Sequence, residues 1–256
     1  MIRPDQSSHF YGRDGTPEYD ATLREARKHG LLPSVTTVLK IKAKPAVEAW
    51  KTNQLLEAVD EVNDLLKIHE TEEWKDAVIA AWQVKMASAP ELGTAYHDHI
   101  EHLITNGESG EYFSNIPNET EIAIIGWLEE NHVVPEKVEH CFADGSIMGI
   151  GGRIDVAGEW QEPCRPFVLD WKTQGTRSGR VNFYQDWAYQ LAANAAGLGN
   201  INVDLVSVVV STTEPGLVEH RVWGDNHIWL QAFQSLHRAW CIEKNYDPFT
   251  GGRYFE

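Results

Sequence analysis

Residues 149–172 constrain the fold of this chain more than any other stretch of its sequence. They contain two short runs with the alternation of half-buried strands: RIDVA, which carries Asp155, and FVLDWK, which carries Asp170 and Lys172. Side chains alternate faces along a strand, so Asp170 and Lys172 point to the same side. Neighbouring strands that bear two carboxylates and a lysine can form a site for a hard divalent ion. A surface hairpin with solvated charges is the alternative for these residues.

Size and cysteine content place the chain among globular proteins of a reducing compartment. Its 256 residues suffice for one large domain or two small ones, and 42% hydrophobic residues with ten tryptophans indicate a packed core. The three cysteines are widely spaced and match neither a disulfide framework nor a four-cysteine cluster, so we expect a cytoplasmic protein. No apolar run is long enough to span a membrane, and the N-terminus lacks the apolar core of a signal peptide.

Charge is distributed unevenly along the chain. The formal net charge of −16 argues against a protein that coats nucleic acid through a broad basic face, but not against an enzyme that handles a phosphodiester in a local groove. Residues 21–51 carry seven Lys or Arg and two Glu, which makes this segment a candidate for facing phosphates. Within it, Ser34, Thr36 and Thr37 could offer hydroxyls and a helix N-terminus to a phosphate. Simple helix capping by Ser34 is the alternative.

The first half of the chain has the periodicity of helices. We expect them at residues 22–28, 45–67, 71–86, 91–105 and 119–131. The helix that follows Pro90 places His97 and Glu101 four residues apart and therefore on one face, with Gly93 one turn earlier. A zinc site built from the nearby histidines is the alternative, but His99 projects away from His97.

From residue 135 the pattern changes to strands and connecting helices. Strands are predicted at residues 137–143, 147–160, 166–172, 204–210 and 217–222, and helices at residues 182–196 and 226–243. Gln190 lies in an otherwise apolar face of the first of these helices, where a buried amide needs partners. We therefore predict a mixed α/β fold, of the α+β type with a mixed sheet and an N-terminal helical elaboration. Residues 1–134 would form the arm and helical region and residues 135–256 the core, joined in one compact unit.

Four motifs stand in one order along the chain. They are G-x-x-x-H-x-x-x-E from Gly93 to Glu101, G-R-I-D ending at Asp155, L-D-W-K ending at Lys172, and Y-Q-L around Gln190. The ordered set resembles the RecB-type branch of the PD-(D/E)XK nuclease superfamily, and more closely phage exonucleases and the mitochondrial genome maintenance exonuclease. A Pro-Ser-Val-Thr-Thr segment precedes the helical region in these relatives, as it does at residues 33–37. The resemblance covers residues 22–194 and implies a restriction-endonuclease-like PD-(D/E)XK core.

The resemblance also implies the residues of the site. A histidine, two aspartates and one backbone carbonyl would bind metal, namely those of His97, Asp155, Asp170 and Trp171. Lys172 would position or activate the attacking water, Gln190 would support the site, and Glu101 would bind the metal or support a ligand. Oxygen-rich ligands favour Mg²⁺ or Mn²⁺, as one or two ions. The chain departs from its relatives at Asn194, where tyrosine is common, and it lacks the four cysteines of the iron–sulfur relatives, so no iron–sulfur cluster is expected.

The predicted function is that of a metal-dependent DNA exonuclease acting in phage-type recombination, replication or DNA degradation. Its predicted partner is DNA, single-stranded or with frayed ends, contacted by Ser34, Thr36, Thr37, Arg177 and Arg180. A phage origin would place the protein in the host cytoplasm, and no membrane association is expected. Three alternatives stay open: a double-strand exonuclease or endonuclease of the same fold, an inactive DNA-binding protein of that fold, and another enzyme with paired carboxylates, such as a sugar-processing one.

Overall fold

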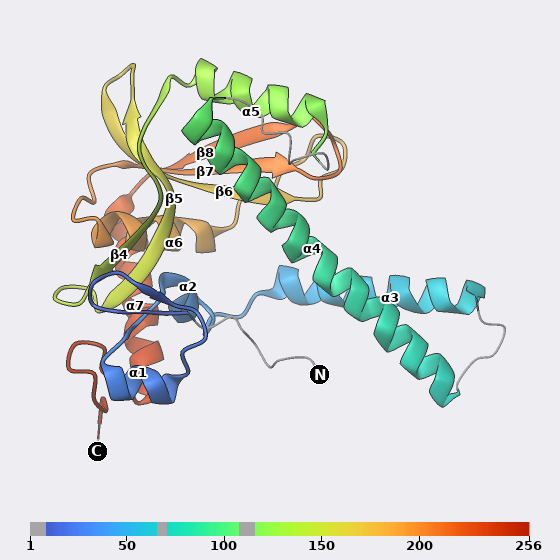
Figure 1. The fold of residues 1–256 in the computed structure, drawn as a ribbon, viewed down its shortest axis with the longest axis horizontal. Helices are drawn as coiled ribbons and strands as arrows, with labels where there is room; N and C mark the ends of the chain where they lie inside the picture. Colours follow the sequence, from blue (N-terminus) through green and yellow to red (C-terminus); the bar gives the residue numbers. More distant parts are fainter. Residues whose placement is uncertain (1–8, 66–70, 108–115, 256) are drawn as a thin grey trace. The chain divides into compact units, whose positions relative to one another are not determined.

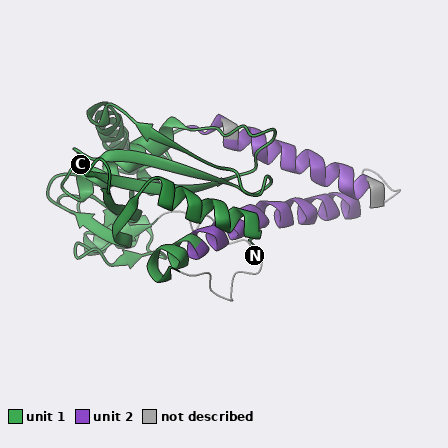
Figure 2. Cartoon of the chain, turned by 90° about the horizontal axis from the view of Figure 1, so that it is seen from above, with its two compact units in different colours: residues 1–42, 100–256 green, residues 43–99 purple. Residues whose placement is uncertain are grey.

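The computed structural model describes residues 9–65, 71–107 and 116–255, and the chain divides into two compact units. The first unit comprises Met1–Lys42 and Ile100–Glu256, and the second comprises Ala43–His99 (Figure 2). The segment that ends at Lys42 therefore groups with the second half of the chain rather than with the helices that follow it. In the described part of the chain, no helix is long and apolar enough to cross a membrane.

A five-stranded mixed sheet forms the centre of the first unit (Figure 1). Its strands, in their spatial order, are β4 (Val133–Asp144), β5 (Ile150–Trp160), β6 (Arg165–Gln174), β7 (Asp204–Ser211) and β8 (Val218–Trp223). Neighbouring strands are antiparallel except for β6 and β7, which run parallel. The mixed α/β architecture predicted from the sequence is confirmed.

Helices cover both faces of this sheet. They are α5 (Asn118–Glu130), α6 (Gln185–Gly197) and α7 (Asn226–Lys244). Parallel strands cannot be joined by a tight turn, so the chain crosses from β6 to β7 through α6, against which α7 packs. Asp170 of β6 contacts Gln190 of α6, and its neighbour Trp171 therefore points to the opposite face. There Trp171 meets Trp127 of α5, with 5.4 Å between the ring centroids.

A small antiparallel sheet and two short helices begin the first unit. They are β1 (Phe10–Tyr11), β2 (Pro17–Glu18), α1 (Leu23–His29), β3 (Leu32–Pro33) and α2 (Val35–Leu39), with the strands in the order β2-β1-β3. A capping box begins α1, because the Thr22 side chain accepts from the Glu25 N–H and the Glu25 side chain accepts from the Thr22 N–H. Gly30 ends α1 in the left-handed conformation, at φ +64°. The helix expected over residues 22–28 is thus present, shifted by one residue.

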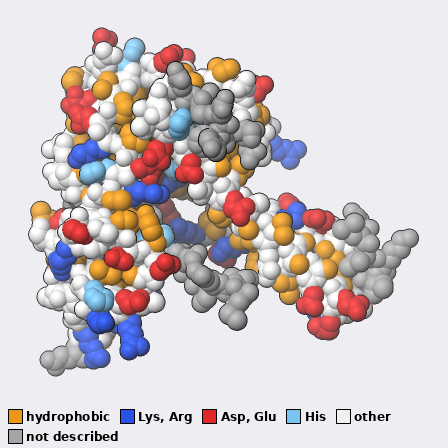
Figure 3. Space-filling view, viewed as in Figure 1, with side chains coloured by type: hydrophobic (Ala, Val, Ile, Leu, Met, Phe, Trp, Pro, Cys, Tyr) orange, Lys and Arg blue, Asp and Glu red, His pale blue; other side chains and the backbone are white. Residues whose placement is uncertain are grey.

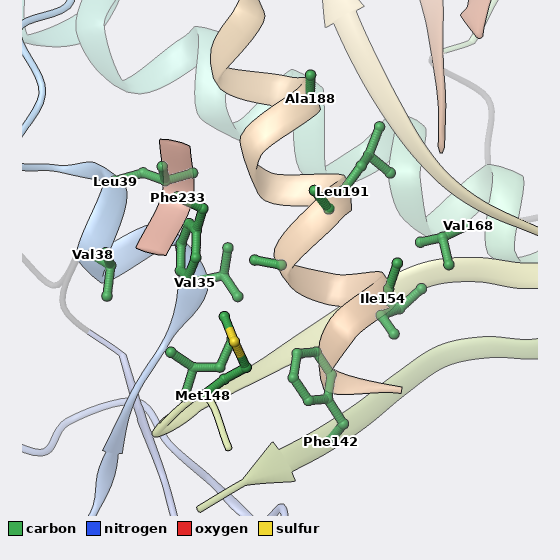
Figure 4. Packing of buried hydrophobic residues seen from close by; sticks show 14 of the residues in the cluster. Val35, Val38, Leu39, Phe142, Met148, Ile154, Val168, Ala188, Leu191 and Phe233 are labelled. Carbon is green, nitrogen blue, oxygen red and sulfur yellow. The ribbon is translucent and has the colours of Figure 1, made fainter. Parts of the chain in front are cut away.

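The hydrophobic core of the first unit lies around α6. Most of the buried side chains of this helix are alanines: Ala188, Ala192, Ala193 and Ala195. Small side chains let the helix approach the sheet closely, and a methyl group at Gly197 would stand only 2.0 Å from the Phe142 ring. Val38 of α2 and Phe233 of α7 close the same cluster (Figure 4). This packing fixes β5 and β6 relative to α6.

Two helices make up the second unit, α3 (Pro45–Leu65) and the part of α4 (Glu72–Asn106) that ends at His99. An ion pair joins them, with Lys85 lying 3.2 Å from Glu61. The predicted helix over residues 45–67 is α3 in its described part, and the prediction for residues 66 and 67 lies outside the described residues.

The predicted break between two helices near Pro90 is wrong, because α4 runs through this residue. Proline lacks the N–H that would bond to a carbonyl of the preceding turn, and its local preference is to begin or kink a helix. Residues 87–92 are exposed, so a backbone carbonyl that loses its helical partner at Pro90 can bond to water instead. The Thr94 hydroxyl also donates to the Pro90 carbonyl, at 3.1 Å.

Candidate metal centre

The backbone pairing between β5 and β6 ends where the sequence places its two aspartates. The last paired residues are Val156 and Leu169. One step further along β5, Asp155 turns its carboxylate towards β6, and its Oδ2 accepts the backbone N–H of Trp171 at 2.8 Å. A side-chain oxygen therefore takes the place of a backbone carbonyl, and the two strands part between Asp155 and Asp170. The parting gives side chains room to gather inside a sheet that is otherwise closed by backbone hydrogen bonds.

Both oxygens of Asp170 are held by neighbouring side chains. Gln190 of α6 donates its Nε2–H to Oδ1 at 3.0 Å, and the Lys172 Nζ lies 2.5 Å from Oδ2. Asp170 is buried, with a relative exposure of 2%, so a charge at this position needs such partners. The amide of Gln190, expected to need a partner in an apolar helix face, finds it in this carboxylate.

The charges of this cluster act strongly on one another. Burial raises the pKa of Asp155, and the Lys172 ammonium and the Trp171 N–H oppose this rise without cancelling it. Burial alone would lower the pKa of Lys172, but Asp170 and Asp155 outweigh it and raise that pKa above its usual value. Lys172 therefore carries its proton in this metal-free arrangement and can donate a hydrogen bond to a water or a phosphate oxygen.

A third carboxylate, that of Glu139 on β4, adjoins this cluster and was not identified from the sequence. Glu139 lies opposite Asp155, between the flanking pairs Val138–Val156 and His140–Ile154. One of its oxygens lies within 4.8 Å of an oxygen of Asp155, and the Arg153 guanidinium pairs with it at 2.8 Å. The backbone of Glu139 has φ +47°, which is rare for a residue with a side chain. No sequence motif marks this residue, and only the register of β4 against β5 reveals it.

The donor atoms of this cluster fit a hard divalent ion. Glu139 and Asp155 offer carboxylate oxygens within 4.8 Å of one another, and Asp170 offers a further carboxylate held by Gln190 and Lys172. Carboxylate oxygens are the ligand type that Mg²⁺ and Mn²⁺ prefer. Two ligands at about 2.1 Å from one Mg²⁺ can be at most about 4.2 Å apart, so the separation of Glu139 and Asp155 requires little adjustment. Each carboxylate oxygen has two lone pairs, and Asp170 can therefore keep its bond to Gln190 and also bind an ion.

The two residues predicted on the helix of the first motif both lie on α4. His97 belongs to the second unit, and its role as a metal ligand stays a prediction. Glu101 belongs to the first unit and is exposed, and within the described part of the chain no hydrogen bond or ion pair joins it to Asp155 or Asp170. The structure thus brings Asp155, Asp170, Lys172 and Gln190 together with the Trp171 backbone, and the role of Glu101 stays a prediction.

The hydroxyl groups near residue 34 mostly serve the fold. The Ser34 Oγ caps α2 by accepting the Thr37 N–H at 2.9 Å, as the capping alternative expected. The Thr37 hydroxyl donates to the His9 carbonyl at 3.1 Å and accepts the His9 N–H at 2.9 Å. Ser34 and Thr37 are buried, whereas Thr36 is exposed. Of these three predicted DNA contacts, only Thr36 presents its side chain to solvent.

Basic side chains of residues 21–51 are partly engaged within the first unit. The Arg27 guanidinium donates to the Lys244 carbonyl at the end of α7, at 2.6 Å. Lys42 pairs with Asp186 and lies 4.8 Å from the centre of the Tyr189 ring. Acidic and basic side chains are interspersed on the face shown in Figure 3. The side chains of Arg27 and Lys42 are therefore engaged in contacts within the first unit.

Comparisons with known proteins leave the family of the chain open. No protein-family model matches the chain, and no curated protein matches it. Among solved structures it is similar to one described as "Crystal structure of SSO0001", with 14% sequence identity and a TM-score of 0.31, over 73% of this chain and 85% of that one. A likeness this distant supports no conclusion about fold or function.

Proposed function

We propose that this chain is a metal-dependent DNA exonuclease with a PD-(D/E)XK core of the RecB type. One observation carries the proposal: the carboxylates of two adjacent strands, the lysine two residues after the second and the glutamine of the crossover helix form one contact network where the strands part. Three motifs that lie far apart in the sequence supply these side chains. A surface hairpin with solvated charges would not bury Asp170 or enclose it with Gln190.

The proposed roles follow from the chemistry of each group. Asp155 and Asp170 would hold Mg²⁺ or Mn²⁺, with Glu139 as a further oxygen ligand and His97 as the nitrogen ligand that the resemblance implies. The ion, when bound, lowers the pKa of a water and stabilises negative charge on the leaving oxygen. Lys172, as a cation, orients the attacking water or neutralises a non-bridging phosphate oxygen. Gln190 keeps the Asp170 carboxylate in one orientation.

The proposed substrate is a single DNA strand that enters from an end. With a net charge of −16 the protein repels long duplex except where basic groups are concentrated. Arg177 and Arg180 are exposed, three and six residues after the end of the strand that carries Lys172. A narrow contact of this kind suits one strand better than the broad face of a duplex.

Release of labelled nucleotides from DNA tests this proposal. Linear single-stranded DNA should be degraded with Mg²⁺ or Mn²⁺ and remain intact with EDTA. A closed single-stranded circle of the same sequence should resist under the same conditions. Cleavage that persists after exhaustive chelation would exclude the metal mechanism. Efficient cutting of the circle would leave a nuclease but exclude entry from an end.

A further inference from the structure

The chain that leaves β6 forms a loop with two exposed guanidinium groups. This loop, residues 175–181, is called the arginine loop below, and it begins three residues after Lys172. Arg177 and Arg180 are both exposed, and within the described part of the chain neither side chain has a hydrogen-bond or ion-pair partner. Both guanidinium groups are therefore available to an external anion.

The arginine loop is closed at its base by one side-chain amide. Gln174, the last residue of β6, donates its Nε2–H to the Asn182 carbonyl at 3.2 Å. The same amide accepts the Asn182 N–H through its Oε1 at 2.9 Å. This reciprocal pair joins the two ends of the loop as a rung of a β-ladder would, and a backbone bridge between Arg177 and Arg180 lies above it.

The outer part of the loop is held by Glu214, from the turn between β7 and β8. Its carboxylate accepts the Thr176 hydroxyl at 2.6 Å and the Gly179 N–H at 3.1 and 3.2 Å to its two oxygens. Ser178 and Gly179 both have positive φ, at +57° and +68°, a conformation that needs such support at Ser178. Thr213 adds two bonds to the backbone of Thr176, each 2.8 Å long. The loop is therefore fixed before any ligand arrives.

The place of the loop relates it to the candidate metal centre. Because β6 and β7 are parallel, their carboxyl ends lie at the same end of the sheet, and the arginine loop and the turn with Glu214 both begin there. Arg177 follows Lys172 by five residues, so their Cα atoms are at most about 17 Å apart. A strand whose phosphate lay at the metal centre would have another phosphate within reach of the loop a few nucleotides away.

An aromatic side chain beside the loop indicates which form of nucleic acid fits. Tyr184, two residues after Asn182, is 39% exposed and packs edge-on against Trp187, with 5.1 Å between ring centroids. Exposed aromatic rings next to arginines are the usual arrangement for stacking unpaired bases while holding their phosphates. Bases in a duplex are already stacked on one another, so this ring favours a single strand.

We propose that the arginine loop is a preformed phosphate-binding element for single-stranded DNA, and that Glu214 is its positioning residue. The inference deepens the proposed function, on which it rests. By charge alone Glu214 would repel DNA, and its loss would strengthen binding. As a positioning residue it has the opposite effect, because without it the loop must be ordered when the strand binds. The sign of the change therefore distinguishes the two.

The affinity of the full chain for a labelled oligo(dT) of twelve nucleotides, measured in EDTA, shows whether loss of Glu214 weakens or strengthens binding. E214A is expected to weaken binding by about 5- to 20-fold, and E214Q, which keeps one acceptor oxygen, by less. The control E219A removes an exposed acid of the neighbouring β8 and should leave binding unchanged or slightly stronger. R177A/R180A should weaken binding further and lower the slope of log K against log salt by about 1.4, from two lost phosphate contacts.

Adding E214A to R177A/R180A should then change nothing more, because Glu214 acts through the two arginines. Equal or tighter binding by E214A, or an additive loss in the triple variant, would overturn the inference. In cleavage of the same oligonucleotide, E214A should raise KM with kcat retained. If the wild type cleaves DNA and E214A has an unchanged KM, the inference fails and the nuclease proposal stands. If E214A weakens binding but the wild type cleaves nothing with Mg²⁺ or Mn²⁺, the nuclease proposal fails and the loop assignment stands.

Discussion

Replacing Lys172 by methionine should destabilise the protein in EDTA, although methionine has a similar length and suits a buried position. The Lys172 ammonium lies 2.5 Å from Asp170 and acts on Asp155 as well. K172M would leave these two carboxylates beside one another without their shared cation. Gln190 and the Trp171 N–H would still donate to them, but neither carries a charge.

The size of the effect follows from the burial of the pair. Removing one partner of a buried ion pair typically costs about 3–5 kcal/mol, because the remaining charge loses its compensation. The Asp170 side chain is 3% exposed and the Lys172 side chain 22% exposed, so partial screening at the lysine favours the lower end, about 3 kcal/mol. In a domain of 150–250 residues this loss lowers Tm by about 6–12 °C.

Thermal unfolding in EDTA, followed by circular dichroism, measures this change. The double variant D170N/K172M should recover most of the lost stability, because asparagine can still accept from Gln190 and no unpaired charge remains at that position. K244M is a matched control, since the Lys244–Glu243 pair is exposed (40% and 57%) and contributes about 1 kcal/mol at most. The reasoning is refuted if K172M unfolds at the wild-type temperature, or if the double variant is less stable than K172M.

Three further predictions concern packing, pH and metal. In urea unfolding, G197A should have a free energy of unfolding about 1–3 kcal/mol below that of the wild type, because its methyl group would meet Phe142 at 2.0 Å. G126A on α5, where the methyl group would meet nothing within 4 Å, should have a free energy of unfolding up to about 1 kcal/mol higher. Burial lowers the pKa of His237 to about 4 in the folded protein, whereas in the unfolded chain this histidine binds a proton already below pH 6.5. The free energy of unfolding should therefore fall by up to about 3 kcal/mol between pH 6.5 and pH 4. The part of the fall due to His237 should be absent in H237Q. Mg²⁺ or Mn²⁺ should raise the Tm of the wild type and leave that of D155N nearly unchanged, and an equal rise in both would place the ion elsewhere.

The features that could be predicted from the sequence are local ones. Alternation along FVLDWK places Asp170 and Lys172 on one face, and the structure joins them in an ion pair. The polar position of Gln190 in an apolar helix face indicates a buried partner, which is Asp170. The helix start marked by a cap at Ser34 falls where its side chain satisfies a backbone N–H group. In each case the sequence signal that supports the prediction lies within a few residues.

The features that could not be predicted depend on pairing between distant segments. Glu139 joins the candidate site because β4 lies in register with β5 and the Glu139 backbone adopts a positive φ, and neither property is visible in its local sequence. The break expected at Pro90 is absent because α4 continues through this exposed residue. The role of Glu214 in fixing a loop 35 residues earlier in the chain likewise appears only once β6 and β7 are seen to be parallel.

The most direct test of the proposed activity is single-turnover cleavage of end-labelled linear single-stranded DNA with Mn²⁺. Three proteins suffice: the wild type, D155N and the control E219Q. Asparagine at position 155 can still accept the Trp171 N–H, so D155N removes a charge from the site while keeping the hydrogen bond that joins the strands. We expect rapid cleavage by the wild type and by E219Q, and a rate for D155N below about one hundredth of theirs. Cleavage by D155N at the wild-type rate, or an equal loss in E219Q, would contradict the placement of Asp155 in the active site.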